Sequence, residues 1–286
     1  MVYKNPEYSE YINQHYVALK IYTRNEEGKK YKEQFAVKAH PTVIFLDAQG
    51  NEVDRILGWN GDPAAYYQMI VDFRDGRNTL AEIKAKLEQD PKNVELNYQL
   101  VKKCLLRGEE EKTKPYYTTI LELDPKDTFG YGEEARGYLA AIQLWETGND
   151  LPLLEQLSIA KNPELVKQGY NILIRHYEKN KQPEKLLSAY EDALQKLPED
   201  YNLMNGYAWY IYENKLNDKY TRGIEVARRA VELKPDAAYI WDTLAWLEYE
   251  NGQKEQALTD MGKAVEISGN AEDYRENLKK MQTGKK

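Results

Sequence analysis

Apolar residues recur at helical spacing along most of the chain, in helix-length segments separated by short polar turns. Five of these segments are followed by a proline, namely Pro91, Pro125, Pro163, Pro198 and Pro235, at intervals of 34, 38, 35 and 37 residues. Because proline cannot continue a helix, each one closes one unit and begins the next. The pattern predicts five units of two helices over residues 94–271 and a capping helix near 271–282.

The predicted units cover residues 94–126, 127–164, 167–200, 201–236 and 238–271, and the second is the most degenerate. Unit 167–200 has large, aromatic or small residues and a proline at fixed spacing: Tyr170, Leu173, Tyr177, Tyr190, Ala193 and Pro198. On these residues the chain resembles the tetratricopeptide repeat (TPR) family over about 93–270. The resemblance implies an all-α TPR superhelix, a solenoid in which each unit buries its apolar faces against its neighbours.

The N-terminal part has a different pattern. It predicts helix 5–14, strand 16–23, helix 29–37, strand 42–47, strand 52–57 and helix 63–74. Alternating apolar residues from Tyr16 to Tyr22 are typical of a strand, and the apolar run from Thr42 to Leu46 is typical of a buried one. The polar turn that follows predicts a hairpin. This part therefore belongs to the α+β class.

Several motifs in this part match the thioredoxin superfamily, namely Phe35-Ala36-Val37, His40-Pro41-Thr42, Phe45-Leu46-Asp47 and Gly58. The chain resembles that family here, which implies a cis peptide bond before Pro41. The family's opening strand and its C-x-x-C motif are absent, so no thiol–disulfide exchange is expected from these residues. The missing strand would lie between 16–23 and 42–47, so either the chain is truncated or these two strands pair directly.

The sequence thus predicts a partial thioredoxin-like domain at 1–76, a connecting helix within 77–92, and a TPR domain at 93–286. Thr79 and Glu82 form a capping-box pattern that begins the connecting helix at about 80–89. We expect this helix to pack against both domains.

Charge and composition narrow the classes of partner. The chain has 286 residues, a formal charge of −7 and a pI of about 5.3, which argues against nucleic acid or an anionic membrane as the main partner. No apolar run is long enough for membrane insertion. Cys104 is the only cysteine, so no intrachain disulfide can form. The expected compartment is cytoplasmic, or periplasmic if a leader has been removed.

Catalytic and metal-binding patterns are weak. His15, His40 and His176 are far apart in sequence, so neither a metal nor another cofactor is expected. Beside Pro41, His40 is either a contact at the thioredoxin family's substrate edge or a solvated loop residue. Cys104 takes an aromatic packing position of its unit, which predicts an inert, buried thiol rather than a reactive one.

The first helices of the last three units supply the candidate binding residues of the TPR concave face. These are Asn171, Arg175 and Lys179, then Asn205, Trp209 and Tyr212, then Asp242, Trp246 and Tyr249, together with His40 and Pro41 from the N-terminal part. Tryptophan and tyrosine repeat one turn apart, which indicates an aromatic ladder, either for binding or for packing between helices. The 24 tyrosines, against 4 phenylalanines, allow the same two interpretations.

The leading functional hypothesis is a scaffold that binds a protein or peptide ligand on the TPR concave face, beside a redox-inactive thioredoxin-like domain. The alternative is a truncated thiol-disulfide oxidoreductase whose C-x-x-C motif lies upstream of Met1. A homodimer is a further expectation, because the strand edges at 16–23 and 42–47 lack a partner.

Overall fold

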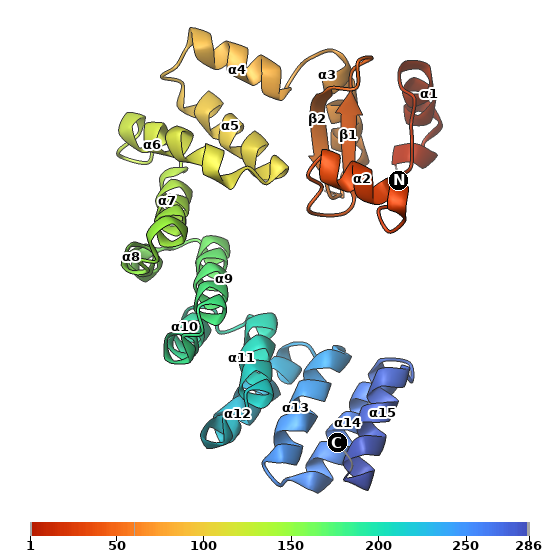
Figure 1. Cartoon of the computed structure of the whole chain (residues 1–286), viewed down its shortest axis with the longest axis vertical. Coiled ribbons are helices and arrows are strands. Elements are labelled where there is room, and N and C mark those ends of the chain that lie inside the picture. The colour runs from red at the N-terminus through yellow and green to blue at the C-terminus, as the bar shows by residue number, and fades with distance from the viewer. Residues whose placement is uncertain (1, 60, 285–286) are drawn as a thin grey trace. The chain divides into compact units, whose positions relative to one another are not determined.

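A computed structural model of the chain describes residues 2–59 and 61–284. Contacts within the chain divide it into two compact units, Met1–Gln156 and Leu157–Lys286. Over the described residues, Figure 1 shows helices and one β-hairpin near the N-terminus. The predicted division at residues 77–92 falls inside the first unit and stays a prediction.

The first unit begins with a small α+β part. Its elements are the 3₁₀ helix η1 (Val2–Lys4), α1 (Pro6–His15), α2 (Glu26–Gln34), β1 (Thr42–Leu46), β2 (Glu52–Leu57) and α3 (Pro63–Arg74). The two strands are antiparallel, with Thr42 opposite Leu57 and an irregularity between Phe45 and Leu46. Phe45 packs edge-on against Phe73 of α3, with ring centroids 5.2 Å apart. The predicted hairpin and the helix that covers it are therefore confirmed.

The predicted strand 16–23 is wrong. Among the described residues, 16–22 belong to no strand, and Val17 and Leu19 are 90% and 80% exposed. Alternating apolar residues favour a strand, but a strand also needs a neighbour for its backbone groups, and β1 pairs only with β2 in the described sheet. A two-stranded sheet is too small to identify a thioredoxin fold, so that resemblance rests on the sequence motifs alone.

Local signals explain the rest of this part. The predicted helix 29–37 instead spans Glu26–Gln34, because the Asn25 side chain caps it by accepting a hydrogen bond from the backbone N–H of Gly28 at 2.7 Å. The positive φ of Ala36, 47°, then turns the chain after the helix. The predicted cis bond between His40 and Pro41 is confirmed.

Helix pairs follow, as the spacing of the prolines predicts. In the first unit these are α4 (Leu80–Gln89), α5 (Val94–Arg107), η2 (Glu110–Thr113), α6 (Lys114–Leu123) and α7 (Gly132–Thr147), and α8 (Leu151–Ile159) crosses the boundary. The second unit holds α9 (Pro163–Lys179), α10 (Pro183–Lys196), α11 (Tyr201–Glu213), η3 (Asn217–Lys219), α12 (Tyr220–Leu233), α13 (Ala238–Glu250), α14 (Lys254–Ile267) and α15 (Glu272–Thr283). Over the described residues the chain thus has a TPR-type helical fold, with the predicted pairs and capping helix in place.

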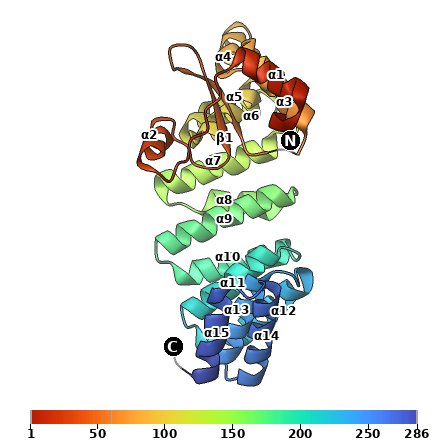
Figure 2. The same cartoon turned by 90° about the vertical axis from the view of Figure 1, so that its right-hand side faces the viewer.

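Small residues allow the paired helices to approach closely. Ala193, Ala230 and Ala257 are fully buried. A Cβ on Gly223 of α12 would lie 3.2 Å from Leu247 and 3.4 Å from Ile211. Figure 2 shows the resulting array of α13, α14 and α15 side by side at the C-terminal end.

Tyrosines join neighbouring helices through their hydroxyl groups. Within the first unit, Tyr117 of α6 and Tyr98 of α5 both donate to the Glu134 carboxylate of α7, at 2.7 and 2.8 Å. Within the second, Tyr207 of α11 donates to Glu191 of α10. Tyrosine can fill a buried layer and still reach a carboxylate, which phenylalanine cannot do. These contacts account for part of the excess of tyrosine over phenylalanine in the sequence.

A buried carboxylate connects the α+β part to the helix pairs of the same unit. Asp54 of β2 has no exposed surface. Its Oδ1 accepts hydrogen bonds from the backbone N–H of Arg55 at 2.8 Å and from Nη2 of Arg107 at 3.1 Å. Its Oδ2 accepts from Nζ of Lys103 at 2.7 Å and from the backbone N–H of Leu80 at 3.0 Å. One side chain therefore holds β2 to α5 and to the first residue of α4.

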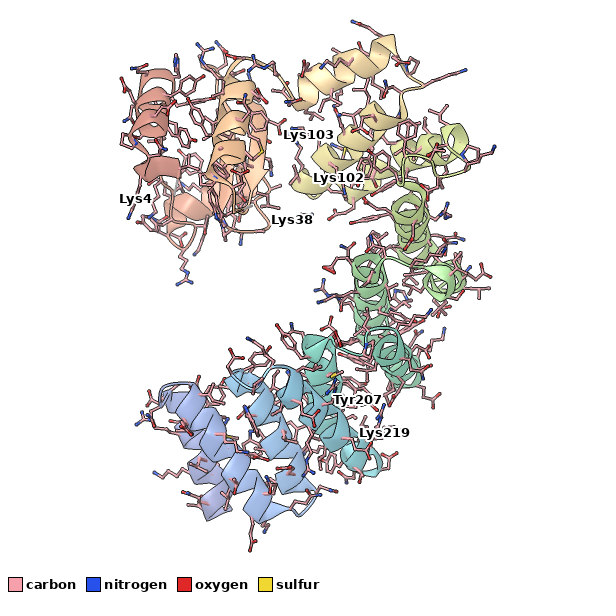
Figure 3. All side chains as sticks on the ribbon, turned by 180° about the vertical axis from the view of Figure 1, so that it is seen from behind. Lys4, Lys38, Lys102, Lys103, Tyr207 and Lys219 are labelled. Atoms are coloured by element: carbon pink, nitrogen blue, oxygen red, sulfur yellow. The ribbon has the colours of Figure 1, made fainter. Side chains whose placement is uncertain are left out.

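Further contacts surround this junction. Nζ of Lys38 donates to the backbone carbonyl of Gly108 at 2.8 Å, and Nη2 of Arg107 lies 3.2 Å from Oε1 of Glu52. Figure 3 labels Lys38 of the α+β part and Lys103 of α5, whose side chains reach across this junction. As predicted, Thr79 caps the N-terminus of α4: its Oγ1 accepts a hydrogen bond from the backbone N–H of Glu82 at 3.2 Å.

We expect Asp54→Asn to destabilise the first unit by about 3 kcal/mol, because the largely buried Lys103 would lose its carboxylate and Arg107 would keep only that of Glu52. Hydrogen exchange measured by mass spectrometry should show faster exchange in β2, α4 and α5. The control is Glu88→Gln, an exposed change on α4 that should leave exchange unchanged. Equal exchange in the two variants would contradict a structural role for Asp54.

Candidate functional site

Nine of the predicted binding residues lie on α9, α11 and α13, the first helices of three successive pairs in the second unit. The beginnings of these helices are joined by polar contacts. Nζ of Lys167 on α9 lies 2.8 Å from Oδ2 of Asp200, the N-cap of α11. The hydroxyl of Tyr239 on α13 donates to Oδ1 of Asn202 on α11 at 2.8 Å. The three helices therefore stand next to one another in sequence order.

The structure brings the four aromatic residues of the predicted ladder together. Trp209 contacts Tyr212 on α11, with ring centroids 5.3 Å apart. Tyr212 stacks on Trp246 of α13 at 5.7 Å and 28°. Trp246 then meets Tyr249 edge-on at 6.1 Å and 80°. We call Trp209, Tyr212, Trp246 and Tyr249 the aromatic ladder.

The two tryptophans of the ladder have different environments. Trp209 is 38% exposed, whereas Trp246 is 9% exposed. Trp246 belongs to a cluster that also contains Met281 and Leu278 of the capping helix α15. Trp246 thus contributes mainly to packing, and Trp209 presents the open end of the ladder to solvent. The sequence could not separate these roles, because both residues occupy equivalent positions in their repeats.

The polar positions beside the ladder also differ from each other. Oδ1 of Asp242 on α13 accepts a hydrogen bond from Nδ2 of Asn277 on α15 at 2.9 Å. Burial raises the pKa of Asp242, and the bond from Asn277 partly opposes this rise. The equivalent residue on α11, Asn205, has a buried Oδ1 with no hydrogen-bond partner among the described residues. An unpaired buried acceptor carries a free-energy cost that a bound donor would remove.

The α9 residues form an exposed polar stripe. Asn171, Arg175 and Lys179 follow one another at four-residue spacing, which puts them on one side of the helix. All three are exposed. The stripe is basic, whereas the α13 end of the set carries the Asp242 carboxyl. The set therefore carries cations at its α9 end and a carboxyl group at its α13 end.

His40 and Pro41 lie in the first unit, whereas the nine residues on α9, α11 and α13 lie in the second. His40 is exposed, and its Nε2 lies 3.3 Å from Oγ1 of Thr23. Cys104 is buried, as predicted, and burial raises the pKa of its thiol. Within residues 2–59 and 61–284, no group of histidine, cysteine and carboxylate side chains has the arrangement of a metal site.

Sequence reasoning missed a buried pair of carboxyl groups between α13 and α14. Glu248 of α13 has no exposed surface, and Asp260 of α14 is 2% exposed. Oε1 of Glu248 accepts from Nη2 of Arg228 at 2.8 Å, while its Oε2 is buried without a partner among the described residues. Oδ1 of Asp260 accepts from Nζ of Lys263 at 2.9 Å. Burial, and next the Asp260 carboxylate, raise the pKa of Glu248 to about 7, although Arg228 lowers it.

The comparisons with known proteins give weak likenesses. No protein-family model matches the chain, and no curated protein matches it in sequence. Among solved structures, the chain is similar to YrrB, described as a TPR protein with an unusual peptide-binding site, at 14% identity and a TM-score of 0.47, over 69% of this chain and 97% of that one. It is also similar to MamA from Desulfovibrio magneticus RS-1, at 16% identity and a TM-score of 0.39, over 67% of this chain and 85% of that one.

A third similar structure is yeast Tom70, at 15% identity and a TM-score of 0.46, over 72% of this chain and 43% of that one. The fold assignment rests on the helix pairs themselves. No helix among the described residues combines the length and apolar character needed to cross a membrane.

The pKa of Glu248 predicts a pH dependence of stability. In the unfolded chain the Glu248 carboxyl group loses its proton near pH 4.5. In the folded chain the same group stays protonated up to about pH 7. The folded state therefore binds the extra proton in this interval, and its stability falls as pH rises through it. This change in the free energy of unfolding is roughly 1–3 kcal/mol over the interval. We expect Glu248→Gln to remove it.

Urea denaturation between pH 4.5 and pH 8, followed by tryptophan fluorescence, would measure this effect. The control is Glu255→Gln, an exposed change on α14 that should leave the pH profile as it is in the unaltered chain. A profile for Glu248→Gln that coincides with that of the unaltered chain would disprove the assignment.

Proposed function

We propose that the chain is a non-catalytic scaffold that binds an extended protein or peptide segment across α9, α11 and α13, beside a redox-inactive thioredoxin-like domain. The observation that carries the proposal is the aromatic ladder, whose rings contact one another across two repeats and end at the exposed Trp209. Rigid, partly exposed tryptophan and tyrosine side chains provide large contact areas at a low entropic cost.

The polar groups around the ladder suggest how a ligand is oriented. Arg175 and Lys179 on α9 favour acidic groups of the ligand. The buried acceptor of Asn205 and the Asp242 carboxyl favour donors, such as a backbone N–H or a basic side chain. A ligand that runs from α9 to α13 would therefore present an acidic end first and a donor-rich end last.

The domain division also belongs to this proposal. It treats residues 1–76 as a partial thioredoxin-like domain, 77–92 as a connecting segment and 93–286 as the TPR domain. The sequence motifs around His40 and Pro41 support the first part. The buried Asp54 junction gives the connecting helix a defined role, because it ties the beginning of α4 to β2. His40 and Pro41 are proposed as contacts for a ligand of this first part, secondary to the residues on α9, α11 and α13.

The oxidoreductase alternative requires cysteines that this sequence lacks. Cys104 is the only one, and its thiol is buried with a raised pKa, which opposes formation of the reactive thiolate. Insulin reduction by a longer natural form that carries C-x-x-C would support the alternative.

We expect Trp209→Ala to weaken ligand binding at least about tenfold, because it removes the exposed ring of the ladder. Peptides selected from a random dodecamer library against the intact chain would serve as probes, and fluorescence anisotropy would measure their affinity. Arg175→Glu should weaken acidic peptides most. The matched control is Trp145→Ala, which removes a 50% exposed tryptophan of α7 in the other unit.

Circular dichroism should give the same helix content for Trp209→Ala as for the unaltered chain, since its side chain is only partly buried. Trp246→Ala is a weaker test of binding, because it also removes core packing. Selected peptides that bind Trp209→Ala and Trp145→Ala equally well would exclude the ladder as the binding surface.

A further inference from the structure

Residues 16–22 form an exposed apolar segment in the first unit, between the end of α1 and a turn that begins at Thr23. We call these residues the exposed segment. Val17 and Leu19 are 90% and 80% exposed, and Tyr22 and Ile21 are 63% and 42% exposed. Large apolar side chains exposed to this extent in one run mark an interaction surface.

The backbone of this segment is hydrogen-bonded only at its two ends among the described residues, where the N–H of Tyr16 donates to Ile12 at 2.8 Å and the carbonyl of Tyr22 accepts from Asn25 at 3.3 Å. Among the described residues, the N–H and C=O groups of residues 17–21 make no hydrogen bond with other backbone groups. Both ends of the segment are held in place. The Tyr16 hydroxyl donates to the carbonyl of Ile70 at 2.7 Å, and Oγ1 of Thr23 lies 3.3 Å from Nε2 of His40. The structure therefore presents a tethered chain segment with free donors and acceptors.

The order of side chains in the segment is nearly symmetric about Leu19. An antiparallel pair of two such segments, centred on this residue, places Tyr16 opposite Tyr22, Val17 opposite Ile21, Ala18 opposite Lys20, and Leu19 opposite its own copy. Aromatic residues thus face aromatic residues and branched residues face branched residues, which are favourable cross-strand pairs. A two-fold axis needs this kind of self-complementary surface.

Charge and side-chain direction agree with such a pair. Val17, Leu19 and Ile21 alternate along the chain, so in an extended strand they point to one face, and two copies would combine them into one apolar surface. The single charge, on Lys20, would lie opposite Ala18 rather than opposite a second lysine. No like charges would therefore face each other directly.

We propose that two copies of this chain associate through the exposed segment, as a two-fold antiparallel strand pair centred on Leu19. The second copy is the occupant that this sequence specifies, because the segment carries on itself the pattern that its partner needs. The edge of β1 in the same chain is the competing partner, but the segment does not pair with it, although the Tyr16 ring lies 5.6 Å from Phe45. This proposal does not depend on the aromatic ladder.

Disulfide crosslinking tests the predicted register. In Leu19→Cys, the two new cysteines face each other across the axis, so mild oxidation should crosslink the chain with itself. In Lys20→Cys, the two cysteines are offset by two residues, roughly 8 Å between Cα atoms, which is too far for a disulfide. A mixture of Lys20→Cys and Ala18→Cys should crosslink again. The unaltered chain is the background control, because Cys104 is buried.

Light scattering provides the second test. The unaltered chain should be dimeric at about 100 µM, as a small interface allows, and Leu19→Lys should be monomeric, since two charges would then face each other. Circular dichroism of Leu19→Lys should be unchanged, because the side chain is largely exposed. A monomeric unaltered chain, or equal crosslinking of Leu19→Cys and Lys20→Cys, would overturn the proposal.

Discussion

The first unit depends on the compensation of one buried charge. Asp54 lies on a strand of a hairpin that is too small to form a stable sheet alone. Besides the backbone N–H of Arg55 on its own strand, its carboxylate is stabilised by donors from α4 and α5, and both cations come from α5. The hairpin therefore needs the helices, and Lys103 and Arg107 of α5 find their compensating carboxylates on the hairpin. This mutual need explains why the α+β part and the first helix pairs form one compact unit.

The remaining helix pairs are held by two kinds of repeated contact. Alanine and glycine let neighbouring helices approach, as at Ala193 and Gly223. Tyrosine hydroxyls reach carboxylates on the next helix, as in the pair Tyr207 and Glu191, where Nη2 of Arg222 adds a further hydrogen bond at 2.9 Å. A ring buried in this way fills space as phenylalanine does, while its hydroxyl selects one arrangement of the helices. A buried tyrosine thus both fills the core and specifies how the neighbouring helices are arranged.

Residues that packing does not bury remain available for partners. In the ladder, α15 covers Trp246 but leaves Trp209 exposed, so two equivalent positions have different roles. In the α+β part, the segment around Leu19 is exposed because β1 pairs only with β2 among the described strands. Both proposed surfaces therefore arise in the same way. The sequence pattern is regular, but the neighbouring element that would cover the side chains is absent or different at that position.

The sequence by itself determined the helix pairs, their register and the capping helix, because prolines, N-caps and apolar spacing act within a few residues. It also indicated the burial of Cys104 and the residues of the ladder. Only the tertiary structure decided that residues 16–22 form no strand, that Trp246 is covered, and that Asp54 pairs with Lys103 and Arg107. These outcomes depend on contacts between residues far apart in the chain, and a local pattern is the same whether or not such a partner is present.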